Sequence, residues 1–152
     1  MIPQFRGREA AAVIQELAAA LHRAGAVPDL LQFYEAALNR EYLCNTVTDP
    51  GWAIPHAPVA GLARACFAVG RWTPSSHWLK SGQPVSLVFL MGIPETDSRT
   101  YMTLVSGVAR MSKAPDLVRE LFEAGDAAGM FNVLKRARVH RAPLSNTIEQ
   151  GA

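Results

Sequence analysis

The sequence predicts an α/β or α+β domain in which helices pack on one central β-sheet. Apolar residues recur at the spacing of amphipathic helices near both ends of the chain. Between them, residues 52–91 hold short apolar runs that are typical of strands. An order of helices, strands and then helices favours one sheet covered by helices. The length of 152 residues fits a single domain.

Two helices are predicted before the strands. Residues 8–24 carry apolar side chains at helical spacing, namely Val13, Ile14, Leu17, Leu21 and Ala24. The second helix has Asp29 as a candidate N-cap and Gln32 three residues on, as in a capping box. It should end near Arg40, and its expected apolar face comprises Leu30, Phe33, Tyr34, Ala37 and Leu38.

Three strands are predicted in the middle of the chain. Residues 44–51 lose all periodicity and end in the turn signal Asp49-Pro50-Gly51. The strand candidates that follow are Trp52–Ile54, Ala63–Val69 and Val85–Met91. The last is almost continuously apolar, which predicts a central buried strand closed by Gly92 and Pro94. The loop from Trp72 to Trp78 is expected to pack its tryptophans over one sheet edge.

Three helices are predicted after the strands, each from a set of apolar residues at helical spacing. The sets are Met102, Val105, Val108 and Ala109; Leu117, Val118, Leu121 and Phe122, ending at Gly125; and Met130, Val133, Leu134 and Ala137. The domain is expected to span residues 1–142, and the polar residues 143–152 are expected to form a flexible tail.

Composition and charge argue against several function classes. The chain is 49% hydrophobic and 18% charged with a formal net charge of +2, as in ordinary globular proteins. The basic residues of segment 135–141 fit a helix C-terminus better than a nucleic-acid patch. No apolar stretch is long enough to span a membrane, and the N-terminus lacks a signal-peptide pattern. We therefore expect a cytoplasmic protein that neither binds nucleic acid nor inserts into a membrane.

The two cysteines do not indicate a metal site. Cys44 and Cys66 lie too far apart for a CxxC pair, and two cysteines are too few for a disulfide framework. A zinc site that combined them with His56 and His77 would lack any pair of ligands at short spacing. The sequence gives no reason to expect a metal or a cofactor, and Cys66 is expected to lie in the core.

The most distinctive segment is Gly51-Trp52-Ala53-Ile54-Pro55-His56-Ala57. Histidine has an unperturbed pKa near neutrality, so at pH 7 its ring offers a neutral nitrogen as nucleophile or ligand. Pro55 fixes its own φ and restricts Ile54 to extended geometry, which stiffens the backbone that carries His56. A short strand that ends in a stiff turn is thus predicted to present this imidazole. A buried histidine without chemistry is the alternative.

Two further residues point to phosphoryl chemistry. Arg40 lies sixteen residues before His56, at the predicted end of the second helix. Its planar guanidinium suits the oxygens of a phosphoryl group, and Thr46 between the two could add a hydroxyl donor. A neutral histidine beside a guanidinium suits reversible phosphoryl transfer, which needs a positioned nucleophile and charge stabilisation. Arg40 could instead be a helix-end cation, and Thr46 could simply cap a turn.

These residues resemble the phosphorylation-site segment of the IIA domains of the sugar phosphotransferase system. The matching branch is the fructose/mannitol class, type 2, which includes the nitrogen-regulatory IIA proteins. The resemblance rests on Arg40-Glu41, Thr46 and Gly51, on Ala53-Ile54-Pro55-His56-Ala57, and on residues 81–94, which are similar to the family's DG-x-PV-x-LVFLL-x-x-P strand. It covers roughly residues 8 to 138.

The resemblance implies a mixed sheet sandwiched between helices, with a phosphohistidine at His56 supported by Arg40. It also implies that the phosphate comes from HPr or its nitrogen-branch counterpart and passes to a IIB cysteine. A regulatory protein whose phosphorylation state switches its binding to other proteins is the second function class, and the sequence leaves both open.

The chain departs from the family pattern at several positions. Val47 and Asp49 replace glycines, Trp52 replaces an aliphatic residue, and the family's N-terminal strand is shortened or absent. Tyr101 stands where the resemblance places a second active-site histidine. A tyrosine can donate one hydrogen bond but cannot carry a positive charge. It could also be a packed helix residue.

Overall fold

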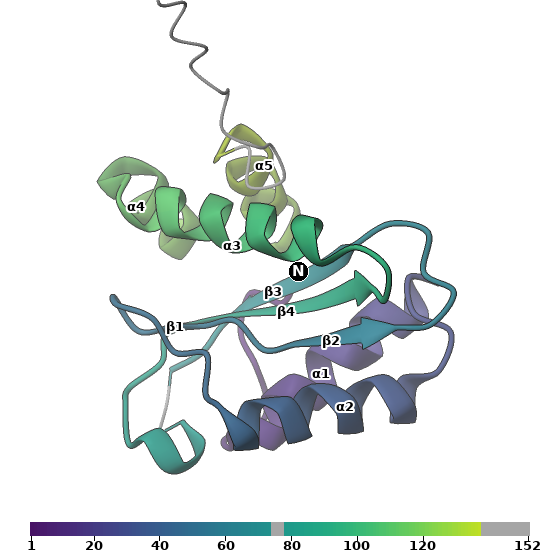
Figure 1. Cartoon of the computed structure of the whole chain (residues 1–152). Coiled ribbons are helices and arrows are strands. Elements are labelled where there is room, and N and C mark those ends of the chain that lie inside the picture. The colour runs from purple at the N-terminus through teal and green to yellow at the C-terminus, as the bar shows by residue number, and fades with distance from the viewer. Residues whose placement is uncertain (74–77, 138–152) are drawn as a thin grey trace, which may run out of the picture.

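The computed structural model describes residues 1–73 and 78–137, which form three layers with a β-sheet in the middle (Figure 1). One face of the sheet is covered by two helices, α1 (Ala10–Arg23) and α2 (Leu30–Leu43). The other face is covered by α3 (Ser98–Ser112), α4 (Pro115–Glu123) and α5 (Ala127–Ala137). The strands are β1 (Trp52–Ala53), β2 (His56–Val59), β3 (Cys66–Arg71) and β4 (Leu87–Pro94), and a 3₁₀ turn, η1 (Leu79–Ser81), precedes β4. The expected mixed sheet between helices is confirmed.

Strand β4 is the centre of the sheet. It pairs parallel with β1 and β2 and antiparallel with β3. Leu87 pairs with both Trp52 and β3, and Met91 pairs with both His56 and β3. A strand can pair along two edges only. Because β3 pairs with the same β4 residues as β1 and β2 do, β3 must lie on one edge of β4, and β1 and β2 on the other. β1 and β2 are therefore two pieces of one strand, interrupted at Ile54-Pro55.

The core lies in two parts, one on each face of the sheet. Val88 and Leu90 of β4 contact the α1–α2 layer, and the alternate residues Leu87, Phe89 and Met91 contact the α3–α5 layer. All eight residues of β4 are buried, as expected for a central strand whose two faces both carry apolar side chains. The buried run predicted from the sequence is thus confirmed, although it begins two residues later and continues to Pro94.

The N-terminal helices form where their periodicity predicts. In α2 the Asp29 carboxylate accepts a hydrogen bond from the Gln32 N–H at 2.9 Å, which confirms the predicted cap. The helix ends at Leu43 rather than near Arg40, because the Cys44 N–H still bonds to the Arg40 carbonyl.

Three other expectations differ from the structure in detail. The strand predicted at 63–69 forms at Cys66–Arg71, and β2 was not predicted at all. In α3, Met102 is 60% exposed and Ala109 is exposed, while Leu104, Val108 and Met111 are buried. The apolar residues of α3 form two overlapping stripes along the helix. Packing against the sheet decides which stripe is buried.

The two tryptophans of the predicted loop lie inside the α1–α2 side of the core. Trp72 and Trp78 are both buried, with ring centroids 5.6 Å apart in an edge-on arrangement. His77 and the predicted tail 143–152 lie outside the described residues. Among residues 1–73 and 78–137, no helix is long and apolar enough to cross a membrane.

Candidate functional site

His56 is the first residue of β2, and its side chain faces the α3 layer. Ala57 and Val59 contact the core under α1 and α2, so the alternate residue His56 must face the other side of the sheet. The sequence had placed this histidine after a strand. In the structure the Pro55 carbonyl accepts from the Met91 N–H at 3.0 Å, so that pairing with β4 resumes at the residue before His56.

One hydrogen bond fixes the orientation of the His56 ring. Nδ1 lies 3.1 Å from the carbonyl oxygen of Ile54. A carbonyl oxygen can only accept, so in the neutral ring the proton sits on Nδ1. The lone pair is then on Nε2, which is the atom that can attack phosphorus or bind a ligand.

Tyr101 of α3 stacks on His56. The two ring centroids are 4.1 Å apart, and the ring planes are inclined by 30°. The two residues line an open pocket of about 200 Å³ together with Pro58, Ile93, Pro94 and Glu95. The stack limits rotation of the imidazole, and the open pocket lies beside it.

Arg40 acts on both rings through its charge. It lies in the last turn of α2, where its Nη1 donates to the Cys44 carbonyl at 3.1 Å. Burial lowers the pKa of His56 most, and the Arg40 guanidinium lowers it further. Burial raises the pKa of the Tyr101 hydroxyl, against the effect of Arg40. At pH 7 the site therefore holds a neutral imidazole, a neutral phenol and a cation.

We expect His56 to titrate below the ordinary histidine pKa of about 6.5. Burial and Arg40 both disfavour the imidazolium, and the Ile54 carbonyl and the Glu41 carboxylate only partly compensate. The folded protein therefore binds this proton less tightly than the unfolded chain, and stability falls as the pH drops below the unfolded pKa towards the folded one. An NMR titration of the ring protons measures this pKa. A midpoint at or above that ordinary value would contradict this expectation.

Glu41 is a site residue that the sequence analysis named within the family resemblance but gave no role. Its side chain is 1% exposed, and its carboxylate accepts from the Thr46 N–H, the Thr46 hydroxyl and the Trp78 indole N–H, each at 2.8 Å. One signal was available: Glu41 follows Phe33 and Ala37 at four-residue spacing, on the face that those two residues bury. A charged residue on the buried face of a helix is expected to be buried as well, and a buried charge needs hydrogen-bond partners.

Thr46 lies beneath the site and does not face it as a free donor. Its hydroxyl donates to Glu41 Oε2 at 2.8 Å and accepts from the Ile54 N–H at 2.8 Å. A hydroxyl has one proton, so this geometry leaves none for a phosphoryl oxygen. The direct donor role considered from the sequence therefore does not fit this arrangement.

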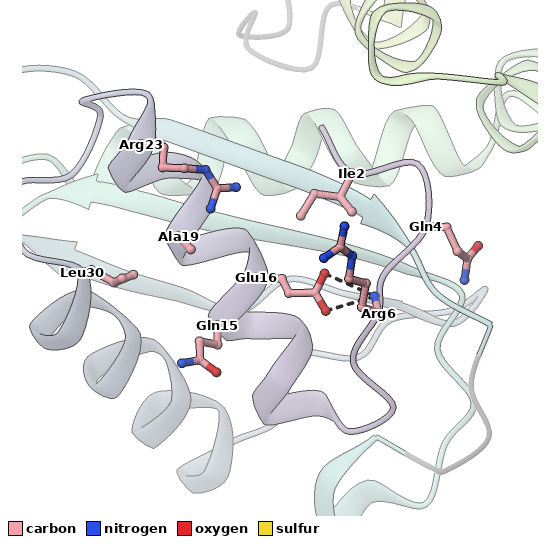
Figure 2. Close-up of a pocket in the computed structure, with 8 residues that line it drawn as sticks. All are labelled: Ile2, Gln4, Arg6, Gln15, Glu16, Ala19, Arg23 and Leu30. Carbon is pink, nitrogen blue, oxygen red and sulfur yellow. Dashed lines mark hydrogen bonds between the residues drawn. The ribbon is translucent and has the colours of Figure 1, made fainter.

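A larger pocket of about 670 Å³ lies in a different part of the molecule, between the N-terminal segment and α1 (Figure 2). Arg6 and Arg23 border it, and the Glu16 carboxylate accepts from the backbone N–H groups of Arg6 and Gly7. That carboxylate fastens the chain to α1, and no described histidine, cysteine, serine or threonine lines the pocket. Chemical composition and not size makes the smaller pocket at His56 the candidate site.

The two cysteines lie apart in the structure. Cys44 is exposed, and Cys66 packs partly buried against the core, where burial raises the pKa of its thiol. Within residues 1–73 and 78–137, no group of three His, Cys, Asp or Glu side chains is placed to hold a metal ion.

Sequence comparisons relate most of the chain to one family. Residues 4–137 match the family described as phosphoenolpyruvate-dependent sugar phosphotransferase system, EIIA 2. The chain is 28% identical over 133 residues to a fructose-specific EIIABC component of Bacillus subtilis, and the match covers 87% of this chain and 21% of that protein. It is 31% identical over 102 residues to a nitrogen regulatory protein of Bradyrhizobium diazoefficiens, covering 66% of this chain and 67% of that protein. The chain thus spans about a fifth of the fructose-specific relative.

Solved structures share the fold. Nitrogen regulatory protein IIA-Ntr of Neisseria meningitidis superposes with a TM-score of 0.74 at 24% identity, covering 88% of this chain and 91% of that one. Mannitol IIA of Escherichia coli gives a TM-score of 0.63 at 15% identity, and the match covers 86% of this chain and 94% of that chain. The complex of mannitol IIA with phosphorylated mannitol IIB from Escherichia coli gives a TM-score of 0.65 at 14% identity. The match covers 88% of this chain and 94% of that chain.

Proposed function

The chain belongs to the EIIA 2 family of the phosphoenolpyruvate-dependent sugar phosphotransferase system, and on that premise we propose that it carries a phosphoryl group on Nε2 of His56. The observation that supports this most is the bond from Nδ1 to the Ile54 carbonyl, which leaves Nε2 as the nucleophile. The donor is an HPr-type phosphocarrier, either HPr or its nitrogen-branch counterpart. No cofactor takes part.

The proposed transfer is a displacement at phosphorus. The Nε2 lone pair of His56 forms a new N–P bond as the N–P bond of the carrier's phosphohistidine breaks, and the bonding electron pair stays on the carrier's ring nitrogen. The Nδ1 proton stays on His56 and keeps its bond to Ile54, so no acid or base is required. Arg40 supplies positive charge for the oxygens of the transferred group, which is the main electrostatic need of such a step.

Incubation with phosphoenolpyruvate, enzyme I and an HPr-type carrier tests the proposal. Intact mass should show the gain of one phosphoryl group. A phosphoramidate on histidine is acid-labile and alkali-stable, so the gain should disappear in acid and persist in alkali. No gain of mass, or a gain that survives acid, would overturn the proposal.

Replacing Arg40 with lysine should slow phosphoryl acceptance about tenfold while the fold stays intact. Lysine keeps the charge but loses the planar pair of donors that matches phosphoryl oxygens. Quench-flow measurement of phosphate uptake gives the rate, and thermal unfolding controls for stability. A variant as fast as the wild type would make Arg40 a helix-end cation without a part in transfer.

Replacing Tyr101 with histidine should speed phosphoryl acceptance roughly tenfold, since a charged donor stabilises the transition state by ~1–2 kcal/mol more than a neutral one. The stacked position of Tyr101 against His56 supports this expectation. Tyr101→Phe is the matched control, because it keeps the stacked ring and removes the hydroxyl. Equal or slower transfer in Tyr101→His would mean that the phenol does more than replace a histidine.

We assign the protein to the regulatory branch of the family, because a site with a neutral phenol suits a lasting phosphorylation state better than rapid flux. The alternative is a IIA component that passes its phosphate to a IIB cysteine. Purified phosphoprotein mixed with IIB domains separates the two. Rapid loss of the phosphoryl group to a IIB domain would favour transport.

A further inference from the structure

The part of the site that phosphoryl chemistry leaves unexplained is the buried carboxylate of Glu41. It acts on His56 through its charge, and that charge is withdrawn from solvent at 1% exposure. Burial of a carboxylate is costly unless hydrogen bonds replace its water. Three donors from Thr46 and Trp78 do so here. The question is why a charge is kept at a position where an apolar residue would also fill the core.

The first step of the answer is that Glu41 fixes the direction of the Thr46 hydroxyl. Because a carboxylate only accepts, the single proton of that hydroxyl must point at Glu41 Oε2. A lone pair of the same oxygen is then free to receive the Ile54 N–H at 2.8 Å. A side chain at residue 41 that could also donate a hydrogen bond would not fix the direction of the Thr46 hydroxyl proton.

The second step is that holding the Ile54 N–H also aims the Ile54 carbonyl. Pro55 follows Ile54, and a residue before proline is confined to extended backbone geometry. With its N–H anchored and its torsions confined, Ile54 can present its carbonyl in only one direction. That carbonyl is the group that holds His56 Nδ1 at 3.1 Å. A chain of hydrogen bonds therefore runs from Glu41 through Thr46 and Ile54 to His56.

We propose that Glu41 is a positioning residue that selects the Nδ1-protonated tautomer of His56 through Thr46 and Ile54. This inference rests on the proposed function for its kinetic consequence only. The tautomer is a property of the unphosphorylated protein and can be measured whether or not a carrier transfers phosphate to it.

The experiment compares Thr46→Val, Thr46→Ser and Glu41→Gln with the wild type. Long-range ¹H–¹⁵N NMR of the histidine ring nitrogens reports which nitrogen carries the proton. Wild type and Thr46→Ser, which keeps the hydroxyl, should show Nδ1–H. Thr46→Val has the same shape without the hydroxyl, and it should show a mixture of the two tautomers. In Glu41→Gln the amide N–H₂ competes as a donor, so the ring should again populate both forms.

Phosphate uptake gives the second readout, and a stability control separates positioning from folding. Thr46→Val should accept phosphate more slowly than Thr46→Ser, by the same factor by which the measured fraction of the Nδ1-protonated tautomer falls. Val133→Ala, in the core on the opposite face of the sheet, lowers stability without touching this chain of bonds and should leave the tautomer unchanged. An unchanged tautomer in either Thr46→Val or Glu41→Gln, or the same shift in Val133→Ala, would overturn the proposal. If no variant or wild type accepts phosphate, the proposed function fails while the tautomer result still decides the role of Glu41.

Discussion

Replacing His56 with alanine is expected to abolish phosphorylation of this protein by an HPr-type carrier. Among the described side chains at the site, the imidazole is the neutral nitrogen nucleophile suited to attack on phosphorus: Tyr101 is a neutral phenol whose pKa is raised by burial, and Arg40 carries no lone pair. Removal of a nucleophile on which a covalent intermediate is built leaves nothing for the phosphoryl group to attach to. The loss should be complete and not partial.

Two controls sharpen this expectation. His22→Ala removes an exposed histidine at the end of α1, whose Nδ1 lies 3.0 Å from the Val27 carbonyl. It should accept phosphate as the wild type does. His56→Gln keeps a polar side chain of similar size, so its unfolding temperature should stay near that of the wild type while its phosphate uptake is nil. Acid-labile label that persists in His56→Ala would place the phosphorylated residue elsewhere.

The residues nearest the proposed chemistry could be predicted because they belong to local patterns. His56 was found from the stiff segment Ile54-Pro55-His56, Arg40 from its spacing to His56 and the family resemblance, and Tyr101 from the resemblance alone. In the structure, α2, β2 and α3 bring these three together: Tyr101 stacks on His56, and the charge of Arg40 acts on both rings. Arg40 and Tyr101 lie near the ends of helices that periodicity could place, and His56 comes just after the predicted strand Trp52–Ile54.

The supporting residues could not be predicted in the same way. Glu41 looks like a surface residue at the end of a helix until Trp78, 37 residues away, is seen to donate to it. β2 is only four residues long, and Pro58 inside it argues against a strand in a local reading, although burial alternates along it in the structure. Its pairing is decided by β4, which lies more than thirty residues further along the chain. Contacts between residues far apart in the sequence depend on the assembled fold, so a short segment of sequence does not predict them.

The buried face of α3 could not be predicted from the sequence either. Met102 and Leu104 are both apolar, and each begins a plausible helical face. Leu104 contacts the core and Met102 stays 60% exposed. The rotation of a helix about its axis follows from the ridges and grooves of its neighbours, which a single amphipathic pattern does not specify.

Replacing Glu41 with alanine should lower the free energy of unfolding by about 3 kcal/mol. The change leaves the buried Trp78 indole N–H and the part-buried Thr46 N–H without their acceptor, and each unsatisfied buried donor costs roughly 1–3 kcal/mol. It also opens a small cavity in the core between α2 and the segment before β1. For a chain of this length the unfolding temperature should fall by roughly 10 °C.

The comparison with Glu41→Gln identifies the cause of that loss. Glutamine keeps the volume and one acceptor oxygen, so it should lower the free energy of unfolding by less than alanine does. Trp78→Phe removes a single donor to Glu41 and should fall between wild type and Glu41→Ala, since the other two hydrogen bonds to the carboxylate remain. Denaturant unfolding followed by circular dichroism measures all three variants. If Glu41→Ala unfolds at the same denaturant concentration as the wild type, the three hydrogen bonds to the carboxylate contribute no net stability, and its burial is only tolerated by the fold.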